Sequence, residues 1–162
     1  MRRMKETPIA ENPPLGRASD TPSLGILLGT VRAEMVRAIE TELASQGVDL
    51  SFTQFLILKK AQQLGPASAT ELARAVELDG GAMTRQLDQL ERKGFLARTP
   101  DAQDRRALRI ALTAAGKKVW RNTASVCHQH VMSAAQSSLD STEQAQLYDY
   151  LSRVLHALRD KS

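Results

Sequence analysis

The chain of 162 residues has the composition of a water-soluble globular protein, with 42% apolar and 25% charged residues and a formal charge of +4. This length allows one domain with appended helices and excludes two large domains. The longest apolar runs, such as residues 55–58, are far shorter than the roughly 20 residues of a membrane-spanning helix. We therefore expect a soluble, cytoplasmic protein with no membrane partner.

The first 22 residues differ in composition from the rest of the chain. Residues 1–22 carry four prolines and show no apolar periodicity, so we expect a flexible or extended arm with no export signal. The next unit, residues 23–50, contains a predicted helix that ends at Gly47. Its apolar side chains recur at helical spacing, at Leu24, Leu28, Val31, Met35, Ile39 and Leu43.

Capping boxes, in which a serine and a glutamine or glutamate three residues later cap each other's backbone, predict two helix starts. The first predicts a helix over residues 52–64, and the second predicts a short helix after Ser68. Asp79 can cap a further helix that ends at Gly94. Two short helices around a tight turn are typical of a helix-turn-helix. The capping pairs are Ser51 with Gln54 and Ser68 with Glu71.

After Gly94 the apolar pattern changes from helical to alternating. Residues 108–112 alternate as a strand does, and residues 95–98 are the expected antiparallel partner. The connection, residues 99–106, is too long for a two-residue hairpin turn, and we interpret this polar loop as a wing. The expected fold is therefore mostly α with a small β-hairpin wing, a winged helix-turn-helix DNA-binding domain over residues 51–112.

Two more helices are predicted at the C-terminus. A long helix covers residues 113–139, and a last helix begins at Asp140 or Ser141. Together with residues 23–50, we expect residues 113–162 to supply the dimerisation helices of a homodimer. The last helix has the narrow apolar seam that typically meets a partner helix, at Leu147, Leu151, Val154 and Leu158.

The most specific stretch of the sequence is GAMTRQLDQLERKG, from Gly81 to Gly94, followed by charged wing residues and by Leu112-Thr113. This stretch resembles the recognition helix and wing of the MarR family of transcriptional regulators, and the resemblance spans residues 24–159. It departs at residues 80–82, Gly-Gly-Ala, where many relatives carry serine or threonine.

The resemblance implies a function as well as a fold. It implies a dimer that binds a pseudo-palindromic double-stranded DNA operator and is not an enzyme. It also implies a small, often phenolic or anionic aromatic, effector in a cleft between the dimer and DNA-binding regions. We expect a repressor that this effector releases, with the effector-binding residues unassigned.

The recognition helix has one face suited to a DNA groove. With residues 83, 87 and 90 buried, arginine and glutamine side chains on the opposite face can pair with guanine and adenine. A glycine at the helix start lets the free N–H groups approach a phosphate. The expected DNA-contacting residues of this helix are Gly81, Thr84, Arg85, Gln89 and Arg92.

The wing carries both signs of charge. Arg105 and Arg106 suit a narrow minor groove or its flanking phosphates. Asp101 and Asp104 would be repelled by DNA if unpaired, so at least one should orient an arginine. Residues 68–112 carry eight lysines or arginines against seven acidic residues, so DNA binding must depend on where these charges lie.

Two alternatives remain beside this interpretation. Cys127 and His130 are three apart, with His156 downstream, but a zinc site needs more ligands than these, so we expect no metal and no cofactor. Cys127 lies on an apolar stripe, and a buried thiol is favoured over an oxidant sensor.

No motif of a hydrolase or a phosphate-binding enzyme is present. The other alternative is a helical protein-interaction module without specific DNA binding.

Overall fold

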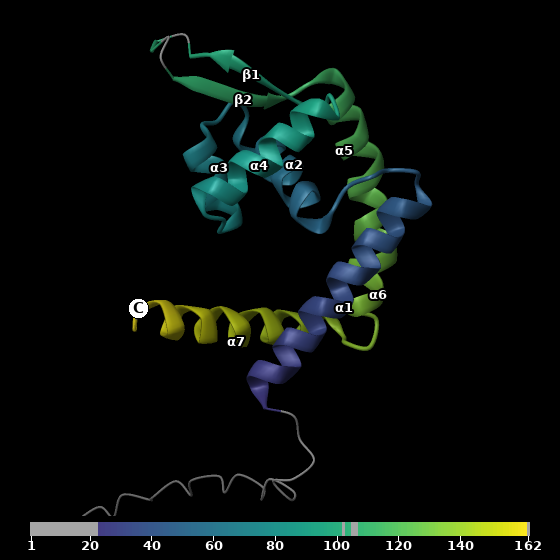
Figure 1. The fold of residues 1–162 in the computed structure, drawn as a ribbon. Coiled ribbons are helices and arrows are strands. Elements are labelled where there is room, and N and C mark those ends of the chain that lie inside the picture. The colour runs from purple at the N-terminus through teal and green to yellow at the C-terminus, as the bar shows by residue number, and fades with distance from the viewer. Residues whose placement is uncertain (1–22, 102, 105–106, 162) are drawn as a thin grey trace, which may run out of the picture.

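The computed structural model describes residues 23–101, 103–104 and 107–161, so the predicted arm over residues 1–22 lies outside the described residues. The expected mostly helical fold with one β-hairpin is confirmed (Figure 1). Its elements are α1 (Leu24–Ser45), α2 (Phe52–Leu64), α3 (Ala69–Val76), α4 (Gly80–Arg92), β1 (Leu96–Pro100), β2 (Leu108–Leu112), α5 (Ala114–Cys127), the π-helical η1 (His128–Met132), α6 (Ser133–Ala135) and α7 (Ser141–Arg159).

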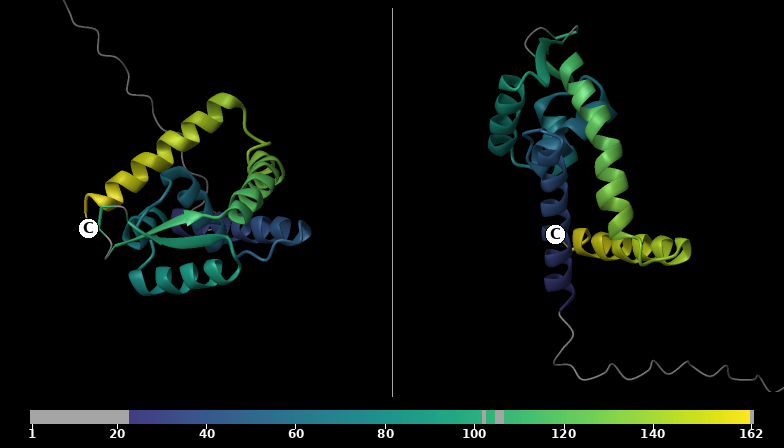
Figure 2. Two further views of the ribbon diagram at one scale, coloured as in Figure 1. Left: turned by 90° about the horizontal axis from the view of Figure 1, so that it is seen from above. Right: turned by 90° about the vertical axis from the view of Figure 1, so that its right-hand side faces the viewer.

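Helices α2, α3 and α4 form a compact unit beneath the hairpin. Helices α1 and α5 extend away from this unit alongside each other, and α7 lies across their far end (Figures 1 and 2). None of the helices in the described part of the chain combines the length and apolarity that a membrane span needs.

Side-chain caps fix where the helices begin. Both predicted capping boxes are present at the starts of α2 and α3. Asp79 caps α4, because its carboxylate accepts a hydrogen bond of 2.8 Å from the Ala82 N–H. Of the two starts considered for the last helix, the structure has Asp140 as the cap, with Glu143 completing the box. Each cap satisfies backbone donors that would otherwise lack a partner.

The core joins α1–α4 to the hairpin. Met83, Leu87 and Leu90 of α4 are buried against it, as the helical spacing predicts. The Ala67 backbone, between α2 and α3, exchanges two hydrogen bonds with Ile110 of β2, which fastens the hairpin to the helices. The most deeply buried large side chains are Leu43, Ile57, Leu58, Leu72, Met83, Leu87, Leu90, Ile110 and Thr123.

The first strand is displaced from its predicted position. We expected residues 95–98, and the strand is Leu96–Pro100. Phe95 is part of the turn that closes α4, because its N–H donates to the Leu90 carbonyl. Pro100 is tolerated as the last residue of the strand, where a missing N–H interrupts no further pairing.

The long helix predicted over residues 113–139 is interrupted. Helix α5 ends at Cys127, and the backbone N–H of Ser133 reaches the His128 carbonyl in the wider π-helical turn. The Ser133 hydroxyl donates to the same carbonyl at 3.3 Å. Apolar spacing predicts a helix here but does not distinguish an α-turn from a π-turn, so η1 was not predictable from the sequence.

Much of the apolar surface of α1 and α7 is uncovered. Helix α7 contains no buried residue, and only Ile39 and Leu43 of α1 are buried. Patches of this extent are unusual on a monomer unless they form an interface. The exposed apolar side chains are Leu24, Ile26, Leu27, Leu28 and Val31 on α1, and Leu147, Tyr148, Tyr150, Leu151, Leu155 and Leu158 on α7.

Gly116 is required where α5 passes the connection between α4 and β1. A Cβ atom at this position would lie 2.0 Å from the Phe95 carbonyl oxygen, which is itself held by the Thr113 N–H. We expect Gly116→Ala to lower the free energy of unfolding by about 1–3 kcal/mol, because backbone must shift to admit the methyl group. Urea unfolding at one protein concentration measures this change.

Gly80→Ala is the matched control, since it makes the same change at the start of α4, where a Cβ would meet nothing within 4 Å and which lies outside the helices expected to form the dimer. The higher helix propensity of alanine should raise stability there, by up to about 1 kcal/mol. A Gly116→Ala protein as stable as Gly80→Ala would contradict the close approach.

Candidate nucleic-acid interface

The turn between α3 and α4 sets the direction of α4. Glu77 closes α3 in the left-handed conformation, with φ of 57°. The N–H of Leu78 then donates to the Ala73 carbonyl at 3.0 Å, and Asp79 begins the next helix. The two helices therefore meet at a tight turn, and α4 presents one long side to solvent.

Four of the five α4 residues predicted to contact DNA lie on the solvent side of this helix. Gly81, Thr84, Arg85 and Arg92 are exposed. The Thr84 hydroxyl donates to the Gly80 carbonyl at 2.9 Å, which leaves its lone pairs as acceptors. Arg85 forms no ion pair with any described residue, so its guanidinium donors face solvent.

Gln89 is the fifth predicted residue and is only partly exposed. Its Oε1 accepts a hydrogen bond of 2.7 Å from Nε2 of Gln54, on α2. The side-chain carbonyl of Gln89 is thus held by α2, while the side-chain NH2 group of Gln89 remains available to donate hydrogen bonds.

The acidic residues of α4 are held by an arginine that the sequence analysis did not single out. Arg98 of β1 donates to Asp88 at 2.7 Å and to Glu91 at 2.8 Å. These two ion pairs join the hairpin to the recognition helix, and the single positive charge of Arg98 offsets part of the negative charge of Asp88 and Glu91 beside the exposed face. The sequence alone does not indicate these ion pairs, because only the folded hairpin brings the strand residue Arg98 beside the helix.

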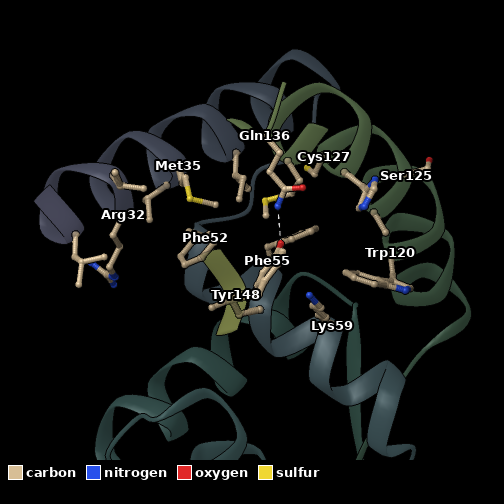
Figure 3. A pocket seen from close by; sticks show the side chains of 18 residues that line it. Arg32, Met35, Phe52, Phe55, Lys59, Trp120, Ser125, Cys127, Gln136 and Tyr148 are labelled. Carbon is tan, nitrogen blue, oxygen red and sulfur yellow. Dashed lines mark hydrogen bonds between the residues drawn. The ribbon is translucent and has the colours of Figure 1, made fainter. Parts of the chain in front are cut away.

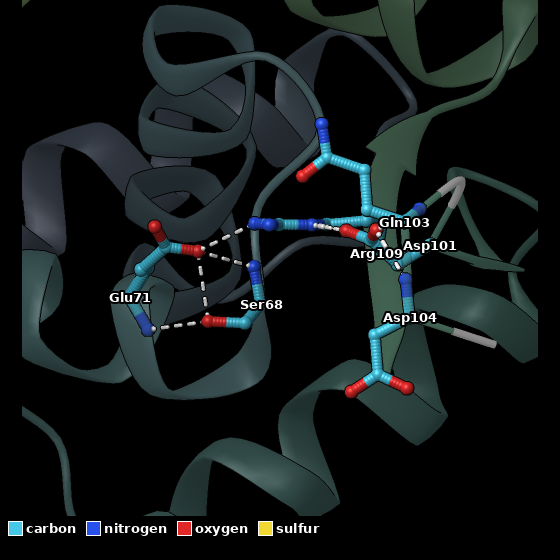
Figure 4. A network of polar contacts seen from close by, with 6 residues as sticks. All are labelled: Ser68, Glu71, Asp101, Gln103, Asp104 and Arg109. Atoms are coloured by element: carbon cyan, nitrogen blue, oxygen red, sulfur yellow. Dashed lines mark hydrogen bonds and ion pairs between the residues drawn. The ribbon is translucent and has the colours of Figure 1, made fainter. Parts of the chain in front are cut away.

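Asp101 anchors the base of the wing (Figure 4). Its carboxylate accepts from Nε of Arg109 at 2.5 Å and from the backbone N–H groups of Gln103 and Asp104 at 2.7 and 3.1 Å. Arg109 also donates to Glu71 of α3 at 3.0 Å, so the network connects the wing to the helix-turn-helix. The hairpin register explains the meeting, since Arg109 lies opposite Thr99, two residues from Asp101.

The hydrogen bonds keep this network charged. The guanidinium of Arg109 and the two backbone N–H groups lower the pKa of Asp101 to about 2. The same contact raises the pKa of Arg109 above its usual value. The pKa of Glu71 is lowered chiefly by the Ser68 backbone N–H. All three side chains are therefore ionised at neutral pH.

The tip of the wing is only partly described. Arg105 and Arg106 lie outside the described residues, so their predicted DNA contacts have no structural counterpart. The backbone of Asp104 belongs to the loop, because its carbonyl accepts from the Ala107 N–H at 2.9 Å. We expected at least one of Asp101 and Asp104 to orient an arginine, and Asp101 holds Arg109 of β2.

A cavity of about 830 Å³ lies between α1, α2 and α5, with one wall residue from α7 (Figure 3). The rings of Phe55 and Trp120 are 5.4 Å apart in its wall. Two cationic side chains, Arg32 and Lys59, line its solvent edge. The aromatic lining residues are Phe52, Phe55, Trp120 and Tyr148.

Cys127 lines the same cavity and is 3% exposed. Burial, with the nearby charge of Glu42, raises the pKa of its thiol, which disfavours the reactive thiolate. His130 lies 3.2 Å from Glu42 and pairs with this residue of α1. Among the described residues no three histidine, cysteine or acidic side chains group as metal ligands.

Comparisons with known proteins agree with this geometry. The sequence profile of the MarR family matches residues 50–108. The multiple antibiotic resistance protein MarR of Salmonella typhimurium is 32% identical over 106 residues, which cover 65% of this chain and 69% of that protein.

Two solved structures share the fold. A cysteine-to-serine variant of Escherichia coli MarR in complex with operator DNA has a TM-score of 0.76 and 28% identity, covering 82% of this chain and 93% of that one. BpsR of Bordetella bronchiseptica, described as regulated in DNA binding by 6-hydroxynicotinic acid, has a TM-score of 0.73 and 20% identity, covering 85% and 95%.

The order of elements, the helix-turn-helix, the wing and the sequence match lead to one assignment. They confirm the resemblance seen in the sequence and the winged-helix fold. Members of this family are transcriptional regulators and not enzymes. This chain belongs to the MarR family of DNA-binding regulators.

Proposed function

We propose that this protein is a homodimeric repressor that binds a pseudo-palindromic double-stranded operator and is released by a small anionic aromatic molecule. The observation that carries the proposal is the exposed face of α4. Arg85 and Arg92 lie on this face with Thr84, while Arg98 engages Asp88 and Glu91 beside it. A helix with this arrangement suits the major groove, and the operator complex of the related MarR supports such docking.

Within this interface the side chains have different roles. Arg85, in the second turn of α4, reads base edges, with Thr84 and Gln89 beside it. Gly81 admits a phosphate to the helix start, and Arg92 contacts the backbone. On the wing, Arg105 and Arg106 approach the minor groove or its phosphates, and Asp101 and Asp104 orient the loop that carries them.

The uncovered apolar faces support a homodimer. Helices α1 and α7 expose apolar side chains along much of their length, and pairing across a two-fold axis would bury them. We assign residues 23–50 and 113–162 to dimerisation and residues 51–112 to DNA binding. Two copies then present two α4 helices to the half-sites of one operator in the bacterial cytoplasm.

The cavity between α1, α2 and α5 suits the effector. Its aromatic walls favour a flat ring, and the cations Arg32 and Lys59 at its edge favour a carboxylate or phenolate. The regulation of BpsR by 6-hydroxynicotinic acid, an aromatic acid, is consistent with this choice.

The first test concerns base reading. Arg85→Ala should cost about 1–3 kcal/mol on a duplex selected by the wild type from a random library, with little change on a scrambled duplex. Arg121→Ala removes an exposed arginine of α5, outside the helix-turn-helix, and is the matched control. Binding isotherms at several salt concentrations measure both.

Two results would oppose the proposal. An unchanged preference of Arg85→Ala for the selected duplex would show that this face of α4 does not read bases. Failure of the wild type to select any duplex, with no salt-dependent DNA binding, would favour the protein-interaction module instead.

The second test concerns the wing. Because the pKa of Asp101 is lowered by folding, from 3.8 to about 2, its ionised contacts stabilise the wing above the unfolded pKa and are lost as pH falls toward 2. At pH 7 Asp101→Asn should therefore weaken DNA binding, although it removes a negative charge.

Asp160→Asn changes net charge equally, at the end of α7, and should leave binding unchanged or slightly stronger. Electrophoretic mobility shifts with one selected duplex compare the two variants. Tighter DNA binding by Asp101→Asn would mean that repulsion between the Asp101 carboxylate and DNA outweighs the anchoring of the wing.

The third test concerns the effector. We expect benzoate to raise the melting temperature and to weaken binding of the selected duplex, and we expect benzylamine, of opposite charge, to do neither. Lys59→Met should reduce the benzoate shift, because it removes a cation from the cavity edge. Lys60→Met, the neighbouring change outside the cavity lining, should retain it, and equal shifts in the two variants would argue against Lys59 as the anion's partner.

A further inference from the structure

Gln54 is an unusual residue for its position, because it is a polar side chain in the core. It is 4% exposed and sits in the first turn of α2. Burying an amide is costly unless its donors and acceptors are paired. Its Nε2 donates to Gln89 at 2.7 Å, and its Oε1 accepts from Lys93 at 3.1 Å and from the Ser51 N–H at 3.4 Å.

These bonds join two helices that have different tasks. Gln89 and Lys93 belong to the C-terminal end of α4 and its cap. Lys93 also forms an ion pair of 3.0 Å with Asp49, just before α2. The end of the recognition helix is therefore fixed by directional bonds to the beginning of α2.

The same turn of α2 lines the cavity. Phe52 and Phe55 belong to its wall, and Phe55 packs against Trp120 with 5.4 Å between ring centroids. Gln54 precedes Phe55 in the chain, and its backbone is held in a hydrogen-bonded helical turn. A molecule that shifts this turn of α2 therefore shifts Gln54 together with Phe55.

On the other side of the bond, Gln89 stands four residues after Arg85 in α4. Residues at this spacing lie on the same side of a helix, so a shift of Gln89 moves the guanidinium that reads DNA. We propose that the hydrogen bond between Gln54 and Gln89 couples the cavity to the recognition helix, which makes Gln54 a positioning residue for regulated DNA binding. This inference rests on the proposed function.

Coupling between two sites is reciprocal, so DNA must act on the cavity if the cavity acts on DNA binding. Trp120 is the single tryptophan of the chain and lines the cavity, so its fluorescence reports the cavity without any effector. We expect a saturating amount of the selected duplex, but not the scrambled duplex, to shift the Trp120 emission and its quenching by acrylamide.

Gln54→Met keeps the size of the side chain and removes the bond. At saturating DNA it should bind the selected duplex but lose the Trp120 response. Gln62→Met, an exposed change on the same helix, should respond as the wild type does. If Gln54→Met fails to fold by circular dichroism, Gln54→Leu takes its place, because it also removes the bond and leaves every side chain of α4 unchanged, and it should also lose the response.

Each result decides the proposal. Loss of the Trp120 response in Gln54→Met or Gln54→Leu, with the selected duplex still bound and with retention of the response in Gln62→Met, supports it. A wild-type response in either bond-breaking variant overturns it, and so does a wild type that binds the duplex without any change at Trp120. A wild type that selects no duplex rejects the proposed function itself, and the coupling with it.

Discussion

Burial of Met83, Leu87 and Leu90 is the constraint on which the interface depends. Each such side chain gains about 1.5–3 kcal/mol on full burial, whereas an exposed ion pair contributes about 0–1 kcal/mol. Rotating α4 by one residue would bring apolar side chains into water, and no surface contact on this helix compensates for that loss. The core therefore decides that Thr84, Arg85 and Arg92 face solvent.

Charge placement follows from this orientation. The helix-turn-helix and wing are nearly neutral, so an excess of positive charge does not explain an affinity for DNA. Instead, Arg98 pairs with Asp88 and Glu91, and Arg109 pairs with Asp101 and Glu71. Such partly exposed ion pairs add little to the free energy of unfolding, and they matter because they determine where the charged side chains lie. They engage acidic side chains at the hairpin while Arg85 remains unpaired among the described residues.

The elements were predictable from the sequence because local interactions specify them. The capping pair of Ser68 with Glu71 is complete within four residues, and so is the cap at Asp79. The partners of Arg98 and Arg109 were not predictable, because they depend on a hairpin register and on the packing of a strand against a helix. The π-turn after Cys127 also escaped prediction, since an apolar stripe fits α- and π-helical turns alike. The predicted roles of the DNA-contacting residues remain predictions.

Helix α2 turns one side to the cavity and another to α4, and the nature of these contacts matters for regulation. Apolar contacts are non-directional and tolerate small displacements, whereas a hydrogen bond weakens steeply with angle. A net hydrogen bond contributes about 0.5–1.5 kcal/mol, and site-to-site couplings in proteins are typically about 1–3 kcal/mol. One hydrogen bond between two side-chain amides is thus of the right size to account for a change of up to about tenfold in DNA affinity. A small regulator therefore needs no large rearrangement, only a displacement of α2 that strains the bond between Gln54 and Gln89.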